Sequence, residues 1–285
     1  DAEKILQIIE TRQVTNFFAA PTMIKRLLDC PAFERYDLSS LKALMYGGAP
    51  MLVDDLTNAM EKLGPCLVQL YGQAESPMTN SYLPHQAHVL RGTEAQIHHL
   101  GSAGIPRTDV EVKIFDPDDN ECPTGQMGEI ATRSDLVMKG YWNDPEATAA
   151  TLRNGWLHTG DLGTMDSRGY VRVTGRVKEM IIRGGENMFP AEIENVLLEH
   201  PSILEVAVVG LPDEKWGEIV ACFVRAATAD VIDPQDLHTH CRQNMSPQKT
   251  PVLWFQVEAF PLTGSGKIRK FELRDRYLAG EYESL

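Results

Sequence analysis

Four segments of the sequence combine glycines with an isolated charged residue, and these are the places where the chain could carry chemistry. The four are YGQAES (71–76), LHTGDLG (157–163), GRVKEMIIRGGENMFPAEIE (175–194) and PLTGSGKIRK (261–270). Short strands that run into glycine-rich turns are where open α/β sheets usually place ligands, so GGAP and LYGQAE are candidate site loops. Each segment alone also has a structural explanation: Asp161 could cap a turn, Arg176 could form a surface ion pair, and Lys267 could lie at a solvated hairpin tip.

Several familiar motifs are excluded. TGSGKIRK resembles the end of a phosphate-binding P-loop, but Pro261 replaces the first glycine of that motif and Ile268 its final Ser or Thr. Neither G-x-G-x-x-G nor G-x-S-x-G occurs, which removes a dinucleotide fingerprint and a nucleophile elbow. His238, His240 and Cys241 could bind zinc, but such a run inside a polar helical pattern more often forms a solvated helix face.

The order and spacing of the four segments resemble those of the adenylate-forming enzymes. This family contains acyl- and aryl-CoA synthetases, nonribosomal-peptide adenylation domains and beetle luciferases, and the resemblance covers essentially the whole chain. It implies an enzyme in which a carboxylic acid attacks the α-phosphate of ATP to give an acyl-adenylate and pyrophosphate, after which a thiol displaces AMP. The implied cofactors and partners are ATP, Mg²⁺, CoA and a small carboxylic acid.

The resemblance assigns the metal and the adenine ring to the first half of the chain. Glu75 corresponds to the family's metal-binding catalytic glutamate, and a carboxylate oxygen suits Mg²⁺. The family's usual threonine before this glutamate is Ala74 here, so one hydroxyl contact to phosphate is missing or supplied elsewhere. The residues that would bind adenine and the rest of AMP in this half are Gly48, Ala49, Pro50, Tyr71 and Gly72.

Three charged residues complete the nucleotide site that the resemblance implies. Asp161 corresponds to the acid that binds the two ribose hydroxyls, since a carboxylate offers two acceptor oxygens. Arg176 corresponds to its permanently charged partner at the ribose. Lys267 corresponds to the catalytic adenylation lysine, whose ammonium would bridge the substrate carboxylate and the α-phosphate in the transition state.

The resemblance also implies a hinge and a CoA site. Lys178 lies at the family's hinge, about which the C-terminal domain rotates between the two half-reactions. The loop with Gly184, Gly185 and Glu186 would then border the pantetheine tunnel, because glycines allow close approach of a thin chain. A lysine that some members carry after the hinge is Ile182 here, so no catalytic residue is assigned there.

The motif GGENMFPAEIE favours the CoA-ligating members, so our first hypothesis is a ligase that activates a fatty or aromatic acid. Its acyl pocket would include residues around Gly47 and the stretch 73–82. Two alternatives stay open: a non-catalytic fragment that binds nucleotide, CoA or a partner, and an adenylation domain that loads a carrier protein. The family's upstream Ser/Thr/Gly-rich phosphate loop is absent, so we expect the C-terminal portion of a longer enzyme, and adenylation by this portion alone is in doubt.

The elements that must position these residues follow an α/β pattern up to about residue 100, with short apolar runs ending in turns and helical stretches between them. A β-rich subdomain is predicted at about 101–175 and a small, mobile α+β domain at 176–285. The predicted fold is therefore α/β: the later part, 1–175, of a large α/β plus β-subdomain N-terminal region, followed by that C-terminal domain. The expected order in the C-terminal domain is β-α-β-β-α-β.

Composition sets the remaining expectations. The chain has 40 acidic and 27 basic residues, a formal net charge of −13, which disfavours nucleic acid as a partner. Five widely spaced cysteines without a C-x-x-C pair favour a reducing cytoplasm. No apolar run is long enough for a transmembrane segment. We leave a homodimer open.

Overall fold

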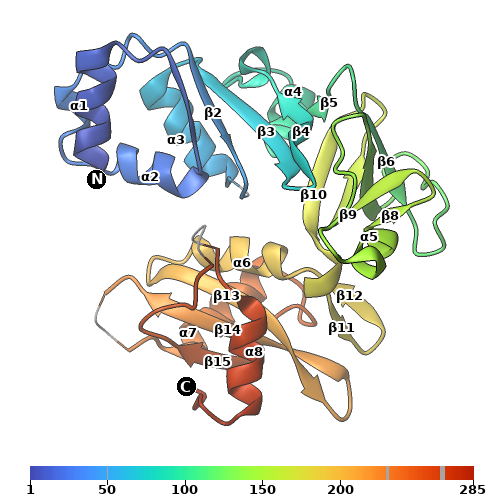
Figure 1. Ribbon diagram of the computed structural model, residues 1–285. Coiled ribbons are helices and arrows are strands. Elements are labelled where there is room, and N and C mark those ends of the chain that lie inside the picture. The colour runs from blue at the N-terminus through green and yellow to red at the C-terminus, as the bar shows by residue number, and fades with distance from the viewer. Residues whose placement is uncertain (50, 229–230, 264–266) are drawn as a thin grey trace. The chain divides into compact units, whose positions relative to one another are not determined.

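The computed structural model describes residues 1–49, 51–228, 231–263 and 267–285. The chain folds as two compact units, Asp1–Val173 and Thr174–Leu285. In Figure 1 the first unit runs from blue to yellow and the second from yellow to red.

The first unit begins with a five-stranded sheet on which three helices pack (Figure 1). The strand order is β1-β2-β3-β4-β5, with β1 to β3 parallel and β4 and β5 added in antiparallel pairing. Leu6, Ile24 and Leu56 of the helices form one buried core with Leu44 and Tyr46 of the sheet. The elements are α1 (Ala2–Arg12), β1 (Asn16–Ala19), α2 (Pro21–Leu28), β2 (Ala43–Gly47), α3 (Val53–Leu63), β3 (Leu67–Gln73), β4 (Ser76–Leu83), α4 (Glu94–His99) and β5 (Ile105–Pro106).

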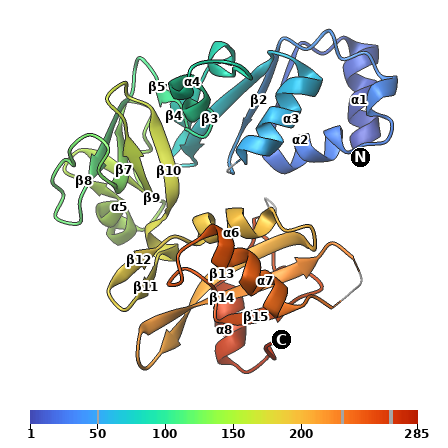
Figure 2. The ribbon, with the colours of Figure 1, turned by 180° about the vertical axis from the view of Figure 1, so that it is seen from behind.

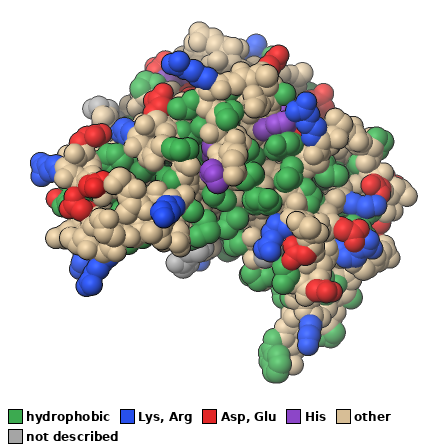
Figure 3. Space-filling model, turned by 90° about the horizontal axis from the view of Figure 1, so that it is seen from above, with side chains coloured by type: hydrophobic (Ala, Val, Ile, Leu, Met, Phe, Trp, Pro, Cys, Tyr) green, Lys and Arg blue, Asp and Glu red, His purple; other side chains and the backbone are tan. Residues whose placement is uncertain are grey.

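This sheet also carries apolar side chains on the face opposite the core. Phe17 packs against the core, so the next residue, Phe18, points to the other face, where it is 47% exposed. Its cross-strand neighbour Met45 is only partly buried. Hydrophobic side chains also cover the centre of the face drawn in Figure 3, and charged side chains lie mainly toward its edges. Apolar side chains on both faces are typical of parallel α/β sheets that are covered on both sides.

A second, β-rich sheet completes the first unit. Its order is β10-β9-β7-β6, with β8 paired to β9, and the pairs β6–β7, β7–β9 and β8–β9 are antiparallel. Val112, Ile114, Ile130 and Val171 form its main core. The elements are β6 (Glu111–Phe115), β7 (Gly128–Arg133), α5 (Pro145–Thr151), β8 (Leu152–Arg153), β9 (Trp156–Met165) and β10 (Val171–Arg176).

The second unit is a sheet with helices on both faces. The strand order is β12-β11-β14-β13, and β15 pairs in parallel with β14. Figures 1 and 2 show α8 on one face and α6 and α7 on the other. Ile193 and Leu237 of α6 and α7 lie in one core, whereas Leu273 of α8 lies in another with Phe223 and Phe255. The elements are β11 (Ile181–Arg183), β12 (Glu186–Met188), α6 (Pro190–Leu198), β13 (Ile203–Asp213), β14 (Gly217–Ala226), α7 (Pro234–Asn244), β15 (Leu253–Gln256) and α8 (Lys270–Leu278).

The predicted fold class is confirmed in these elements, with two corrections. The LHTGDLG segment, in which Asp161 could have capped a turn, instead lies inside the ten-residue strand β9. The expected first strand of the second unit is a hairpin, β11–β12, followed by the helices and strands in the expected order.

Candidate active site

The structure brings together two residues that the sequence placed at the nucleotide. Tyr71, in β3, donates a hydrogen bond from its hydroxyl to Oδ2 of Asp161, in β9, over 2.8 Å. Asp161 is 7% exposed. A carboxylate so far out of water is costly unless it is hydrogen-bonded, and Tyr71 supplies a bond of this kind. The two sheets of the first unit therefore meet at a buried acid, Asp161, whose carboxylate is hydrogen-bonded across the sheets by Tyr71.

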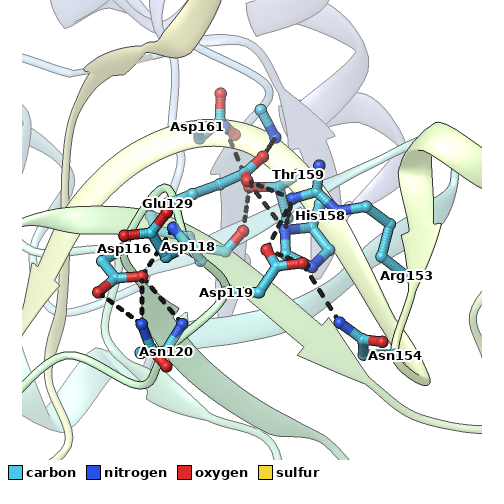
Figure 4. Close-up of polar contacts among 12 residues, drawn as sticks. Asp116, Asp118, Asp119, Asn120, Glu129, Arg153, Asn154, His158, Thr159 and Asp161 are labelled. Carbon is cyan, nitrogen blue, oxygen red and sulfur yellow. Dashed lines mark hydrogen bonds and ion pairs between the residues drawn. The ribbon is translucent and has the colours of Figure 1, made fainter.

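The bend that presents Asp161 is fixed by neighbouring side chains (Figure 4). Gly160 has φ +72°, and the β7–β9 register is irregular between Glu129 and Ala131. One oxygen of Glu129 accepts the Gly160 N–H at 3.0 Å. The Thr159 hydroxyl donates to the carbonyl of Ile130 at 2.6 Å and accepts the Asp161 N–H at 3.1 Å. The positive φ of a glycine thus lets β9 bulge without ending, which is why a segment that reads as a turn is a strand.

Glu129 is itself held by a polar network on the β-rich sheet (Figure 4). Its second oxygen lies 2.9 Å from Nδ1 of His158 and 3.3 Å from Nη2 of Arg153. Arg153 also contacts Asp119 at 3.1 Å. Both Glu129 oxygens are therefore engaged, one by this network and one by the backbone next to Asp161. Sequence reasoning missed this network, because its members are separated by up to 39 positions of unremarkable polar sequence.

The glycines at the ends of β2 and β3 are required for different reasons. A Cβ on Gly47 would lie 2.1 Å from the Leu70 carbonyl oxygen and 2.8 Å from the Met78 side chain, and a Cβ on Gly72 would lie 2.6 Å from the Met78 backbone. Gly48 has φ +79° and open space around its Cβ position. Close strand packing thus requires Gly47 and Gly72, and the backbone turn requires Gly48. Ala49 follows, partly buried, and Pro50 lies outside the described residues.

Glu75 lies in the tight turn between β3 and β4, and its contacts come from a distant loop. Its Oε1 accepts a hydrogen bond from the Tyr141 hydroxyl at 2.7 Å, and its backbone carbonyl accepts one from the Met138 N–H at 2.8 Å. The bond to Glu75 holds the pKa of Tyr141 above its ordinary value, so the phenol stays a proton donor. The sequence analysis missed Tyr141, because nothing in its local sequence, KGYWNDPEAT, points to Glu75.

The side chains at Glu75 fit a metal that is shared with a phosphate. Mg²⁺ in nucleotide sites usually binds through one or two carboxylates plus phosphate oxygens and water. Within the described ranges, no group of three or more His, Cys, Asp and Glu side chains could hold a metal by itself. The hypothesis that His238, His240 and Cys241 of α7 bind zinc is not supported by their surroundings. The His240 ring lies 2.8 Å from the carbonyl of Val196, and Cys241 is buried in the core.

In the second unit, the residues expected at the hinge form a short 3-10 turn after β10. Arg176 is the last residue of β10, and Lys178 lies in the turn Val177–Glu179. Glu179 pairs with Lys270 of α8 at 2.9 Å, and Lys270 also pairs with Glu194 of α6 at 2.8 Å. Burial lowers the pKa of Lys270, but the two carboxylates raise it by more, so the net pKa is above its ordinary value.

The residues expected near CoA form the turn of the β11–β12 hairpin. Gly184 has φ +59°, and its N–H donates to the carbonyl of Trp216 at 2.7 Å. A Cβ on Gly184 would lie 2.8 Å from the Trp216 ring, whereas Gly185, with φ +86°, has open space around its Cβ position. Glu186 begins β12 and is exposed. The predicted loop is therefore a two-residue hairpin turn of defined conformation.

Lys267 follows the part of its loop that lies outside the described residues. Its N–H donates to the Thr263 hydroxyl at 3.0 Å, and its carbonyl accepts the Thr263 N–H at 2.8 Å. Leu262 and Ile268 form an isolated antiparallel bridge beside it. The base of the loop is thus fixed, and Lys267 itself is exposed.

Comparison with known proteins decides the family. Residues 1–142 match the family model "AMP-binding enzyme", and residues 192–267 match "AMP-binding enzyme C-terminal domain". The chain belongs to the AMP-binding enzyme family. The predicted resemblance to adenylate-forming acyl-CoA synthetases is thereby confirmed.

Relatives of this chain include several ligases. It is 39% identical to a feruloyl-CoA synthase of Amycolatopsis sp. over 277 residues, covering 97% of this chain and 55% of that protein. It is 37% identical to a medium/long-chain-fatty-acid–CoA ligase of Mycobacterium tuberculosis, covering 98% and 49%. The chain spans about half the length of the curated relatives it matches.

Solved structures of the same family are similar to this chain over the same extent. The amide bond synthetase of Marinactinospora thermotolerans superposes with a TM-score of 0.86 at 35% identity, covering 97% of this chain and 55% of the other. The o-succinylbenzoate CoA synthetase of Bacillus subtilis, solved with its acyl-adenylate intermediate, gives 0.84 at 32%, covering 96% and 54%. No helix among the described residues has the length and apolar character needed to cross a membrane.

Proposed function

We propose that this adenylate-forming chain functions in an ATP-dependent acyl-CoA ligase that activates a fatty or aromatic acid as its acyl-adenylate. The observation that carries the proposal is the buried Asp161 carboxylate bonded to Tyr71, a site suited to a ribose diol, in a chain of this family. Adenine would lie along Tyr71, Gly72, Gly48 and Ala49. Relatives named as CoA ligases support CoA as the acceptor.

Two bonds change in each half-reaction. An oxygen of the substrate carboxylate attacks the α-phosphorus while the bond to pyrophosphate breaks, and the CoA sulfur then attacks the acyl carbon while AMP leaves. Glu75 would hold Mg²⁺, which supplies positive charge to the phosphates when bound. Lys267 would stabilise the charge that develops between the acid and the α-phosphate, and Asp161 and Arg176 would bind the ribose.

We also propose roles for the two regions of the chain and a cellular location for the enzyme. Residues 1–175 would belong to the nucleotide- and acyl-binding domain, and 176–285 would form the mobile domain that turns about Lys178. The β11–β12 turn with Gly184, Gly185 and Glu186 would border the pantetheine arm. All five cysteines are unpaired, which suits a cytoplasmic enzyme.

An ATP–pyrophosphate exchange screen over aliphatic and aromatic acids tests the first half-reaction in the natural full-length protein. We expect exchange with at least one class of acid, dependent on Mg²⁺, and formation of the acyl-CoA when CoA is added. ATP binding without exchange by any acid would favour the non-catalytic binding module.

A carrier protein should be tested as the acyl acceptor in a separate assay, because one relative, from Streptomyces coeruleorubidus, is named a fatty acid–[acyl-carrier-protein] ligase. Exchange without acyl-CoA formation, together with acylation of a phosphopantetheinylated carrier protein, would replace CoA by a carrier protein as the acceptor. The adenylation half of the proposal would stand in that case.

A further inference from the structure

The loop before α5 holds Glu75 at two points. The Tyr141 hydroxyl donates to Oε1 of Glu75 at 2.7 Å, and the Met138 N–H donates to the Glu75 carbonyl at 2.8 Å. One bond fixes the backbone of the turn and the other fixes the carboxylate. Both come from a segment more than 60 positions away in the sequence, so they are not part of the local β3–β4 turn.

The same loop is itself anchored to helix α5. Asp144 is the N-cap of α5, and its side chain accepts the Ala147 N–H at 2.9 Å. The Thr148 hydroxyl donates to the Asp144 carbonyl at 2.7 Å and accepts the Tyr141 N–H at 2.9 Å. A capped helix therefore fixes the backbone of Tyr141, and this places the Tyr141 hydroxyl within hydrogen-bonding distance of Glu75.

Glycine at position 140 is a condition for this packing. A Cβ there would lie 2.9 Å from the Thr148 methyl group, tighter than ordinary contacts. The backbone of Gly140, with φ +152°, can therefore pass beside α5 only without a side chain.

The Glu75 carboxylate keeps acceptor capacity after this bond is made. An ionised carboxylate offers about four acceptor positions on two oxygens, and the Tyr141 hydroxyl occupies one on Oε1. A neutral donor on one oxygen restricts rotation of the carboxylate without adding a competing positive charge. Partners of this kind orient ligating carboxylates in metal sites.

We infer that Tyr141 is a positioning residue for Glu75, which it holds in the orientation that binds the metal of a metal–nucleotide complex. This inference rests on the proposed function, since it requires that Glu75 contributes to metal binding. Tyr141 acts through Glu75 and is assigned no contact with substrate.

The test is the gain in nucleotide affinity that Mg²⁺ confers, measured by calorimetry on the natural full-length protein with a nonhydrolysable α,β-methylene ATP. Titrations with excess Mg²⁺ and with EDTA give the two affinities. We expect Tyr141→Phe to lower the affinity for the Mg²⁺ complex about tenfold and to leave the metal-free affinity unchanged, because partners of metal ligands typically contribute 10- to 100-fold. Glu75→Gln should remove the gain entirely.

Two further variants separate positioning from general damage. Tyr36→Phe is a matched control, because the Tyr36 hydroxyl also donates to a glutamate, Glu3, at 3.3 Å but on an exposed surface away from the site. It should leave both affinities unchanged. Thr148→Val, which removes the acceptor for the Tyr141 N–H, should lower the Mg²⁺ gain in the same direction as Tyr141→Phe.

The outcomes are distinguishable. If Glu75→Gln loses the Mg²⁺ gain while Tyr141→Phe keeps it, the positioning role is overturned and the proposed function stands. If the wild-type protein shows no Mg²⁺-dependent gain, the proposed metal role of Glu75 fails first. If Tyr141→Phe lowers the metal-free affinity equally, Tyr141 supports the nucleotide site in general and the inference is wrong.

Discussion

The candidate residues of the two units are held in different ways. In the first unit, Asp161 lies within a strand and receives a hydrogen bond from Tyr71 of another strand, and Glu75 is tied to Tyr141. In the second unit, Arg176 ends strand β10, and the other candidates lie in turns and loop ends: the 3-10 turn with Lys178, the β11–β12 turn and the loop of Lys267. Groups that side chains of other elements hold in place are preorganised for a ligand that stays bound, whereas groups in turns and loop ends suit steps in which the protein changes conformation.

This contrast leads to an expectation for the two half-reactions. Changes in the first unit should affect both, because AMP is part of the substrate in each. Substitutions in the second unit should slow one half-reaction more than the other.

The largest effect is expected at Lys267. Lys267→Ala should lower ATP–pyrophosphate exchange by about 10²- to 10³-fold, the range for removing one group that stabilises transition-state charge. Transfer from a preformed acyl-adenylate to CoA should stay largely intact, as measured by thioester formation. Lys25→Ala, which breaks an exposed pair with Asp55, is the control. Equal loss of both half-reactions would sink the adenylation role.

Asp161→Asn should have the next largest effect, and here both half-reactions should fall together. A hydrogen bond to a charged group contributes about 1.5–3 kcal/mol, which corresponds to roughly 10- to 100-fold in nucleotide affinity. Binding of AMP by calorimetry and both half-reaction rates measure it. A variant that loses only one half-reaction would break the contrast between the units.

Lys178→Pro should slow thioester formation by about tenfold, within the range caused by small displacements of reacting groups, while adenylation changes less. Proline fixes φ and restricts the preceding residue, so the turn loses backbone freedom. Single-turnover rates of the two steps measure the difference. Comparable rate changes in both steps would remove Lys178 from the hinge.

The smallest expected effect is a difference in stability between substitutions at two adjacent glycines, Gly184 and Gly185. Both have positive φ, so Gly184→Ala and Gly185→Ala should each destabilise, but Gly184→Ala also drives a methyl group into the Trp216 ring. We expect it to be about 1 kcal/mol less stable than Gly185→Ala, the low end for overpacking, because Trp216 is 43% exposed and can shift. Urea unfolding measures this, and equal stabilities would mean that the ring moves freely.

The sequence predicted the strands and helices well because most have clear periodicity and turn residues at their ends. It failed at LHTGDLG, where glycine signals a turn but the Gly160 bulge keeps the strand continuous. Local pattern could not reveal that Glu129 accepts the Gly160 N–H, since that bond depends on strand register.

The predicted nucleotide residues came from a resemblance of motifs, and the structure adds what motifs do not contain. Tyr71 and Asp161 are 90 positions apart, and their contact follows only from the packing of two sheets. Tyr141 was missed for the same reason: its partner Glu75 is 66 positions away. The residue roles that we propose come from motifs, but the partners that hold those residues become visible only in the fold.

The pairing of Lys270 with Glu179 and Glu194 has a mechanical consequence. The chain immediately after Lys178 is fastened through Lys270 to α6 and α8, and Arg269, beside Lys270, donates its N–H to the carbonyl of Pro261 at the base of the Lys267 loop. The segment after Lys178, the helices α6 and α8 and the base of the Lys267 loop are therefore joined through two adjacent residues, Arg269 and Lys270. If Lys178 is the hinge that we propose, these parts of the second unit would move together when its backbone torsion changes.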